Sequence, residues 1–145
     1  MRFLAWHVDY FKCRITERGR SPLVEEYDEP ETVAEDALLV LASVQKEDEA
    51  APETVARRAA AEIATHAASL KVQTIILHPF AHLFGKLSRP ATAVRVLQAI
   101  EEALQAKGFA VTRTPFGWFN TLDIRAKGHP LSRVARIIHA EEPSP

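Results

Sequence analysis

The chain lacks most of the features that mark specialised classes of protein. A single cysteine among 145 residues cannot form an internal disulfide or a cysteine-rich zinc cluster, and this usage fits a reducing cytoplasm. The formal net charge is −1, so any RNA contact would have to be local rather than carried by the whole molecule. No stretch approaches the ~20 apolar residues of a membrane span, and the N-terminal residues do not resemble a signal peptide. We therefore expect a cytoplasmic protein without a membrane partner.

Familiar catalytic motifs are missing as well. The sequence has no Gly-rich phosphate loop, no Gly-x-Ser-x-Gly nucleophile elbow and no paired-cysteine metal motif. Cys13 could supply a thiolate, but a lone cysteine is more often a small buried hydrophobe. The acid-rich stretch 22–36 is typical of a solvated face, because nothing pairs its carboxylates for acid–base work. The 47% of hydrophobic residues and 26% of charged residues are ordinary values for one globular domain.

What the sequence does contain is a pattern of strands interrupted by two long helices. Strands are predicted at 2–11, 12–16, 36–44, 72–78, 109–115, 118–126 and, more weakly, 131–140, where the β-branched pair Ile137 and Ile138 favours strand over helix. Helices are predicted at 51–71 and 90–108, with a proline near each start and Gly108 as the stop of the second. Residues 17–35 read as a long excursion, and residues 79–89 as a loop or short helix.

This order of elements predicts the fold class. A helix between two strands acts as a crossover that returns the chain to the same sheet. We expect an α/β (α+β) fold in which two main helices cover a mixed β-sheet. The domain would span residues 1–139, and residues 140–145 would be a linker or a frayed C-terminus.

Two histidines four residues apart, His78 and His82, raise the question of a metal site. A zinc pair at this spacing needs a continuous helix, but Pro79 biases His78 away from the helical region. Nothing in the spacing selects a third ligand. We therefore predict no metal, with His78 as a strand-end residue bonded to backbone. His82 is the better candidate because it lies in the loop after a strand, where functional residues gather.

Two further stretches each allow a structural and a functional interpretation. Residues 114–120 hold a Pro-Phe-Gly turn followed by aromatics, which could fill the core of a hairpin or form a wall on which a base stacks. Residues 126–131 hold Lys127 and His129 around Gly128, which would be either a surface turn or a site that meets a phosphate. The residues alone favour the structural interpretation for 114–120 and do not separate the two for 126–131.

Several stretches nevertheless occur together in the order and at the spacings of one known domain. They are HVDY, ASVQKEDE, HPFAHL, KGFAVTRTPFGW and KGHPL. In this combination the chain resembles, over residues 1 to 139, the N-terminal editing domain of archaeal threonyl-tRNA synthetase. The resemblance implies a fold like that of D-aminoacyl-tRNA deacylase, usually as a homodimer.

The resemblance also implies an activity. It implies hydrolysis of L-serine wrongly attached to tRNA(Thr), with the 3′-terminal adenosine and the serine in one pocket. Catalysis would rely on the RNA's own 2′-OH and a positioned water, without a metal or other cofactor. The synthetase's catalytic domain would act with this domain in cis or in trans. The alternatives are clearance of D-aminoacyl-tRNA and a non-catalytic module that binds the tRNA acceptor end.

Matching the motifs position by position assigns the site residues. Pro79, Phe80 and Ala81 match pocket backbone, and His82 matches the motif histidine. The other matching stretches contribute substrate-binding residues: Val44, Phe116, Gly117, Trp118, Phe119, Asn120, Lys127 and His129. We expect His82 and Asn120 to take part in catalysis. The family has a lysine and a glutamate where this chain has Asn120 and Arg133, and we expect activity to persist through backbone, water and the 2′-OH.

Overall fold

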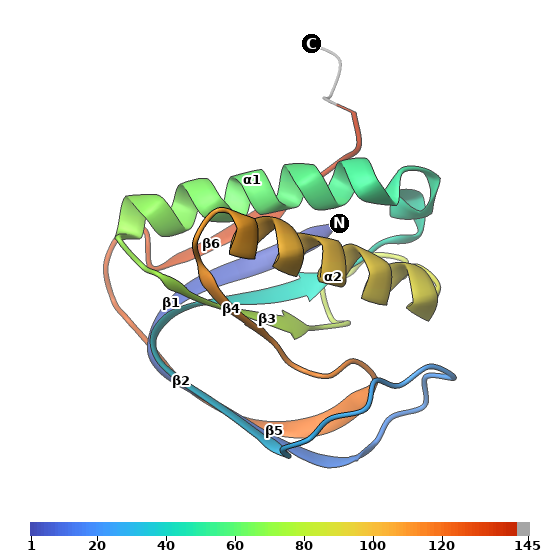
Figure 1. The fold of residues 1–145 in the computed structure, drawn as a ribbon, viewed down its shortest axis with the longest axis horizontal. Coiled ribbons are helices and arrows are strands. Elements are labelled where there is room, and N and C mark those ends of the chain that lie inside the picture. The colour runs from blue at the N-terminus through green and yellow to red at the C-terminus, as the bar shows by residue number, and fades with distance from the viewer. Residues whose placement is uncertain (142–145) are drawn as a thin grey trace.

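Two helices lie side by side across one face of a strongly curled sheet (Figure 1). The computed structural model describes residues 1–141. The strands are β1 (Arg2–Arg18), β2 (Glu31–Ser43), β3 (Thr74–Pro79), β4 (Ala110–Arg113), β5 (Trp118–Ala126) and β6 (Arg133–Ile137). The helices are α1 (Pro52–Leu70) and α2 (Pro90–Ala106), preceded by the 3₁₀ helix η1 (Lys46–Ala50). The predicted class, two main helices on a mixed sheet, is confirmed.

The strand order of the sheet is β4-β3-β2-β1-β5, and β6 also pairs with β1. β2, β3 and β4 run parallel, whereas β1 pairs antiparallel with β2, β5 and β6. Each parallel pair needs a crossover, and α1 and α2 supply the two crossovers. Both helices therefore begin at the edge of the sheet where β2 and β3 end.

The two strands predicted at 2–11 and 12–16 form one continuous strand, β1, which corrects the prediction. No glycine, proline or asparagine separates them, so nothing in the chain makes a turn there. A bulge between Val8 and Tyr10 bends the strand instead. The first half of β1 pairs with β6 and the second half with β5, so this bend divides the sheet into two parts.

β2 begins at Glu31, five residues before the predicted start at Asp36, so the predicted excursion 17–35 is too long. The many acids of this segment suggested a loop. Arg14 of the neighbouring strand lies 2.7 Å from Glu31, and Lys12 lies 3.6 Å from it. Opposite charges on paired strands stabilise a sheet, which explains why an acidic segment forms a strand here.

The remaining elements follow the prediction closely. Residues 133–137 form a strand, as the β-branched residues predicted. The segment 80–89 contains no helix before α2 begins at Pro90. An isolated bridge joins Leu87 of this segment to Gln45. Of the predicted linker 140–145, residues 142–145 lie outside the described part. Among residues 1–141, neither helix is both long and apolar enough to cross a membrane.

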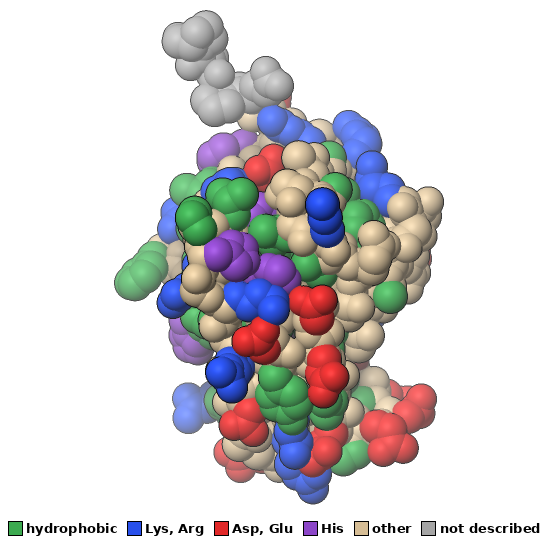
Figure 2. All heavy atoms as spheres, turned by 90° about the vertical axis from the view of Figure 1, so that its left-hand side faces the viewer, with side chains coloured by type: hydrophobic (Ala, Val, Ile, Leu, Met, Phe, Trp, Pro, Cys, Tyr) green, Lys and Arg blue, Asp and Glu red, His purple; other side chains and the backbone are tan. Residues whose placement is uncertain are grey.

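Apolar side chains are buried on both faces of the sheet. The larger cluster lies under the helices, and its largest members include Ile63, Leu97 and Ile100. The smaller cluster lies inside the curl, around Phe11, and contains Cys13, which is 2% exposed. Burial raises the pKa of the Cys13 thiol to about 11, so it acts as a buried hydrophobe. On the face shown in Figure 2, acidic and basic side chains are interspersed.

Candidate functional site

A cavity of about 780 Å³ opens where β2 and β3 end. Such carboxyl ends of parallel strands are the usual binding crevice of open sheets that contain them. The volume lies within the range of about 300–1,000 Å³ that is typical of small-molecule sites. Its lining combines strands, loops and the first turns of α2: residues 19–21, 42–44, 78–82, 87, 88, 90, 93, 97, 116–120 and 122.

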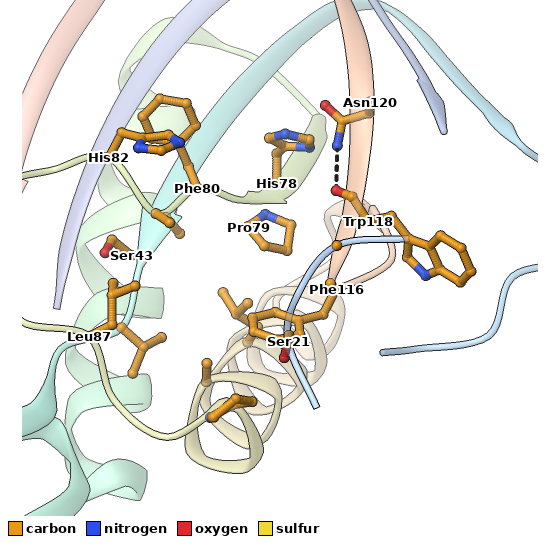
Figure 3. Close-up of a pocket in the computed structure, with 18 of the residues that line it drawn as sticks. Ser21, Ser43, His78, Pro79, Phe80, His82, Leu87, Phe116, Trp118 and Asn120 are labelled. Carbon is orange, nitrogen blue, oxygen red and sulfur yellow. Dashed lines mark hydrogen bonds between the residues drawn. The ribbon is translucent and has the colours of Figure 1, made fainter. Parts of the chain in front are cut away.

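The first wall of the cavity is the segment His78–His82. β3 runs in register with β2, which sets Pro79 beside Ala42, and the N–H of Phe80 donates to the Ala42 carbonyl at 2.9 Å. The Phe80 ring meets the His82 imidazole edge to face, with centroids 5.4 Å apart. In Figure 3 these two rings lie on one side of the cavity. His82 is exposed, so its ring is free to meet a ligand.

His78 is a wall residue that the sequence prediction left out of the site. It is 3% exposed, and its Nδ1 lies 2.8 Å from the Thr114 hydroxyl. The predicted backbone bond is thus replaced by a side-chain partner. Burial lowers the pKa of His78 to about 4, so the imidazole is neutral at physiological pH. Its position before a proline indicated only a strand end, and the long-range pairing with Thr114 left no signal in the sequence.

The second wall is the turn and strand start at Phe116–Asn120. Gly117 has φ +95, a backbone region that favours glycine, and a Cβ there would come within 2.6 Å of Val24. In Figure 3 the Phe116 ring faces the cavity, whereas the Trp118 indole turns away from it. Asn120 lines the cavity and donates from Nδ2 to the Trp118 carbonyl at 3.3 Å.

The Trp118 indole is held by contacts within the protein. Its ring meets Tyr27 edge to face at 5.1 Å, and its Nε1–H donates to the Glu25 carbonyl at 2.7 Å. The two interpretations of the stretch 114–120 were aromatics packed inside the protein and an aromatic wall for a base. Trp118 fits the first interpretation, and Phe116 suits the second. The prediction that Trp118 itself contacts substrate stays a prediction, and only its backbone is directed to the cavity (Figure 3).

A brace behind the second wall was missed by the sequence analysis. The Glu25 carboxylate accepts from the Phe116 N–H at 3.0 Å and forms an ion pair with Arg113. Burial opposes the charge on Arg113, but the hydrogen bond and attraction of Glu25 outweigh it and raise the pKa of the guanidinium. Because Glu25 lies in an acid-rich loop, it looked like one more solvated carboxylate. The brace holds the loop 19–25 and the wall together.

Nine predicted site residues and Val44 line the cavity together, whereas Lys127 and His129 lie elsewhere. Lys127 forms an ion pair with Asp9 and lies 3.8 Å from Asp36, and its pKa is raised chiefly by the hydrogen bond to Asp9. His129 Nε2 lies 2.9 Å from His7 Nδ1. These contacts explain both side chains without a ligand, and their predicted role in substrate binding stays a prediction.

The chemistry of the cavity is that of a largely neutral site. Among the described lining residues, only Arg20 carries a permanent charge, and the polar groups are hydroxyls, imidazoles and the Asn120 amide. Within residues 1–141 no group of three or more His, Cys, Asp or Glu side chains is arranged to hold a metal ion. Such a site can bind an uncharged planar group and orient a water through neutral donors and acceptors.

Comparison with known proteins gives this cavity a context. Residues 1–138 match the model of a family described as the archaea-specific editing domain of threonyl-tRNA synthetase. The chain is 38% identical over 144 residues to threonine–tRNA ligase of Methanobrevibacter smithii, covering 98% of this chain and 23% of that protein. It is 40% identical over 142 residues to the Methanocaldococcus jannaschii ligase, with the same coverage.

A third relative gives the same result. The threonine–tRNA ligase of Methanococcoides burtonii is 41% identical over 143 residues, which is 97% of this chain and 22% of that protein. The chain thus spans less than a quarter of the length of the curated relatives it matches. With this match over nearly all of its length, the chain belongs to the archaea-specific editing-domain family of threonyl-tRNA synthetase.

Proposed function

We propose that the chain hydrolyses L-seryl-tRNA(Thr), removing serine that has been wrongly attached to threonine tRNA. The observation that carries the proposal is the convergence of two distant stretches, 79–82 and 116–120, on one neutral cavity in a member of this editing-domain family. The cavity is large enough for a nucleoside with a small ester, at about 780 Å³.

The terminal adenosine would lie against the apolar part of the lining. The Phe116 ring and the side chains of Leu97 and Leu87 offer a surface for the base. The seryl ester would then lie near Pro79 and Ala81, where the chain leaves β3 and backbone groups face the cavity. This arrangement uses shape and backbone rather than charge, in keeping with the neutral lining.

Hydrolysis of this ester needs a positioned water and stabilisation of the developing oxyanion. The ester is already activated, so orientation and a few fixed donors supply most of the required rate increase. Asn120 can hold a water through its amide, and exposed His82 can orient the ester or its water. The 2′-OH of the terminal ribose would assist from the substrate itself. In this scheme His82 acts as a positioner more than as a base.

Discrimination between serine and threonine would rest on the size of the cavity. Threonine carries one methyl group more, and a difference of this size gives only ~1–3 kcal/mol in binding. A second site that excludes the larger amino acid multiplies the selectivity of the first. Ala42, near the end of β2, and Val44, just after it, are candidates for the contact that the extra methyl would meet.

The partners follow from the same proposal. The substrate is the acceptor end of tRNA(Thr) with its 3′-terminal adenosine, and the catalytic synthetase domain would act in cis or in trans. We expect the chain to be a homodimer in solution. No cofactor is required by this chemistry.

The experiment that tests the proposal compares ester hydrolysis among three substrates. L-seryl-, L-threonyl- and D-aminoacyl-tRNA(Thr) are incubated with the chain, and the rate constant for loss of each ester is measured. We expect fast loss of the L-seryl ester alone. Fast loss of the D-ester with the L-seryl ester untouched would assign the chain to D-aminoacyl-tRNA clearance. Tight binding of all three with no hydrolysis would make it a binding module.

A further inference from the structure

We propose that Phe84, with Lys46 and Lys86, forms a platform for the unpaired nucleotide that precedes the terminal adenosine of a single-stranded RNA 3′ end. The inference rests on the proposed function and extends it from the cavity to the surface beside it. None of these three residues lines the main cavity. Phe84 lies two residues after His82 and three before Leu87, both of which do line it.

The exposure of Phe84 is the first observation. Its side chain is 100% exposed, whereas of the phenylalanines that line the cavity Phe119 is 53% exposed and Phe80 and Phe116 are half-buried. Phe84 also has φ +64, a left-handed backbone that is unfavourable for a bulky residue. Neither burial of its ring nor its backbone preference explains this conformation, so the surrounding loop must impose it.

The loop is in fact held at several points around Phe84. The Arg2 guanidinium donates to the Leu83 carbonyl at 2.9 Å, and the Lys46 N–H donates to the Lys86 carbonyl at 2.8 Å. Gly85 lies so close to Gln45 that a Cβ would overlap the Gln45 amide oxygen. These contacts fix the backbone on both sides and leave the Phe84 ring directed to solvent. A backbone that is already held in place loses little freedom when a base stacks on the ring that it carries.

The charge beside Phe84 is the second observation. A shallower hollow of about 430 Å³ adjoins the main cavity and shares Leu87 and Ser88 with it. Lys46, Lys86 and Arg89 line this hollow, together with the single carboxylate of Glu49.

The carboxylate is already committed to the arginine. Glu49 accepts from the Arg89 backbone at 2.8 Å and from Nε at 3.2 Å, and the backbone bond is the main reason why the pKa of Glu49 is lowered. Within residues 1–141, neither Lys46 nor Lys86 has an ion-pair partner. Two lysines without an ion-pair partner among these residues therefore lie near Phe84 along the backbone: Lys86 follows it by two residues, and Lys46 is hydrogen-bonded to the Lys86 carbonyl.

Lysines without an ion-pair partner in the described part of the chain, near an exposed aromatic ring on a held backbone, match the chemistry of single-stranded nucleic acid. Bases of any identity stack on an aromatic face, and phosphates bind Lys side chains in an adjoining groove. The hollow adjoins the cavity that would hold the terminal adenosine, because Leu87 and Ser88 line both. The nucleotide next to that adenosine would therefore reach Phe84 and the two lysines.

The test separates this platform from the cavity by using two substrates of different length. Phe84→Ala and the double variant Lys46→Gln/Lys86→Gln are assayed on L-seryl-tRNA(Thr) and on 2′(3′)-O-seryl-adenosine, which has no second nucleotide. Stacking of one base is worth roughly tenfold in affinity, so KM for the tRNA should rise roughly tenfold in Phe84→Ala. The kinetics on seryl-adenosine should be unchanged. Matched controls are Ile137→Ala, which is 57% exposed on β6, and Lys71→Gln/Lys107→Gln.

Equal losses on both substrates, or no loss on either, would overturn the proposal. If Phe84→Ala changes the sedimentation of the chain and lowers both activities, the ring contacts a second copy and the proposal is also wrong. Binding of a four-nucleotide RNA that ends in CCA and carries no amino acid keeps the test independent of catalysis. If the wild type hydrolyses neither ester, a roughly tenfold loss of RNA affinity in Phe84→Ala still supports the platform, and an unchanged affinity overturns it.

Discussion

His78 combines burial with a titratable ring, and this gives the protein a defined sensitivity to acid. Its pKa in the folded chain is about 4, against an ordinary value of 6.5. Above pH 6.5 the ring is neutral in both states and contributes no pH dependence. As the pH falls from 6.5 towards 4, the unfolded chain takes up a proton that the folded chain does not. The free energy of unfolding therefore falls across this window, by about 3 kcal/mol in total.

The measurement is urea unfolding of the wild type and of His78→Gln at a series of pH values between 7.5 and 4. Glutamine can keep a hydrogen bond to Thr114 but does not titrate, so the variant should lose markedly less stability towards pH 4. His139→Gln, at an exposed position, is the control and should follow the wild type. Parallel curves for His78→Gln and the wild type would contradict the assignment.

His82 tests whether a side chain or the substrate supplies the main catalytic help. The ring is exposed and packs edge to face with Phe80, and within residues 1–141 it has no carboxylate partner that would activate it as a base. We expect His82→Ala to lower kcat/KM on L-seryl-tRNA(Thr) by less than about tenfold. Removal of the terminal 2′-OH should cost about 10²–10³, the usual effect of losing one group that acts in the transition state. His139→Ala, at an exposed position outside the cavity, is the control. A larger loss from His82→Ala would make the imidazole a true general base.

At the level of elements, the turn that carries Phe116 depends on Gly117, and three glycines allow strain and steric overlap to be separated. Gly117 has φ +95 and no room for a Cβ, Gly108 has the same φ with open space, and Gly128 has neither constraint. The loss of stability on substitution by alanine should decrease in that order. We expect about 1 kcal/mol for Gly108→Ala, clearly more for Gly117→Ala and close to zero for Gly128→Ala.

Urea unfolding of the three variants measures these losses. Gly117→Ala should in addition slow hydrolysis of the seryl ester, because the wall that it displaces lines the cavity. If Gly117→Ala is no more destabilising than Gly108→Ala, the close approach to Val24 is not a constraint.

The elements differ in how much of them the sequence could predict. Helices α1 and α2 have a proline at the start and a long apolar stripe, so local signals were enough. β1 and the first part of β2 were misjudged because their stability comes from cross-strand pairs such as Arg14 with Glu31. Such pairs join residues far apart in the chain, and no local pattern reports them.

At the level of the whole molecule, the site also contains features that the sequence could predict and features that it could not. Residues 79–82 and 116–120 were predicted together because they resemble a family pattern, and both line the cavity. Periodicity and spacing alone did not bring them together. The brace from Glu25 to Phe116 and the pair His78–Thr114 could not be predicted, because each depends on how distant segments meet. Lys127 was predicted in the site because it lies in a matching stretch, but in the structure it forms an ion pair with Asp9.

The overall charge of the molecule leads to a last prediction, on the salt dependence of RNA binding. The net charge is −1 and, among the described residues that line the cavity, only Arg20 carries a permanent charge, so few phosphates can be neutralised at once. Each phosphate contact to single-stranded RNA contributes about −0.7 to the slope of log K against log salt concentration. With Lys46 and Lys86 as the main contacts, the slope for an RNA ending in CCA should lie near about −1.4. Lys46→Gln/Lys86→Gln should bring this slope close to zero.

The control is the matched pair Lys71→Gln/Lys107→Gln. These residues lie where the two helices end, at the opposite end from the loop 80–89 (Figure 1), and their substitution should leave the slope unchanged. Fluorescence anisotropy between 50 and 300 mM KCl measures the slope, and a value several times steeper would mean that cations elsewhere on the molecule also bind the RNA backbone.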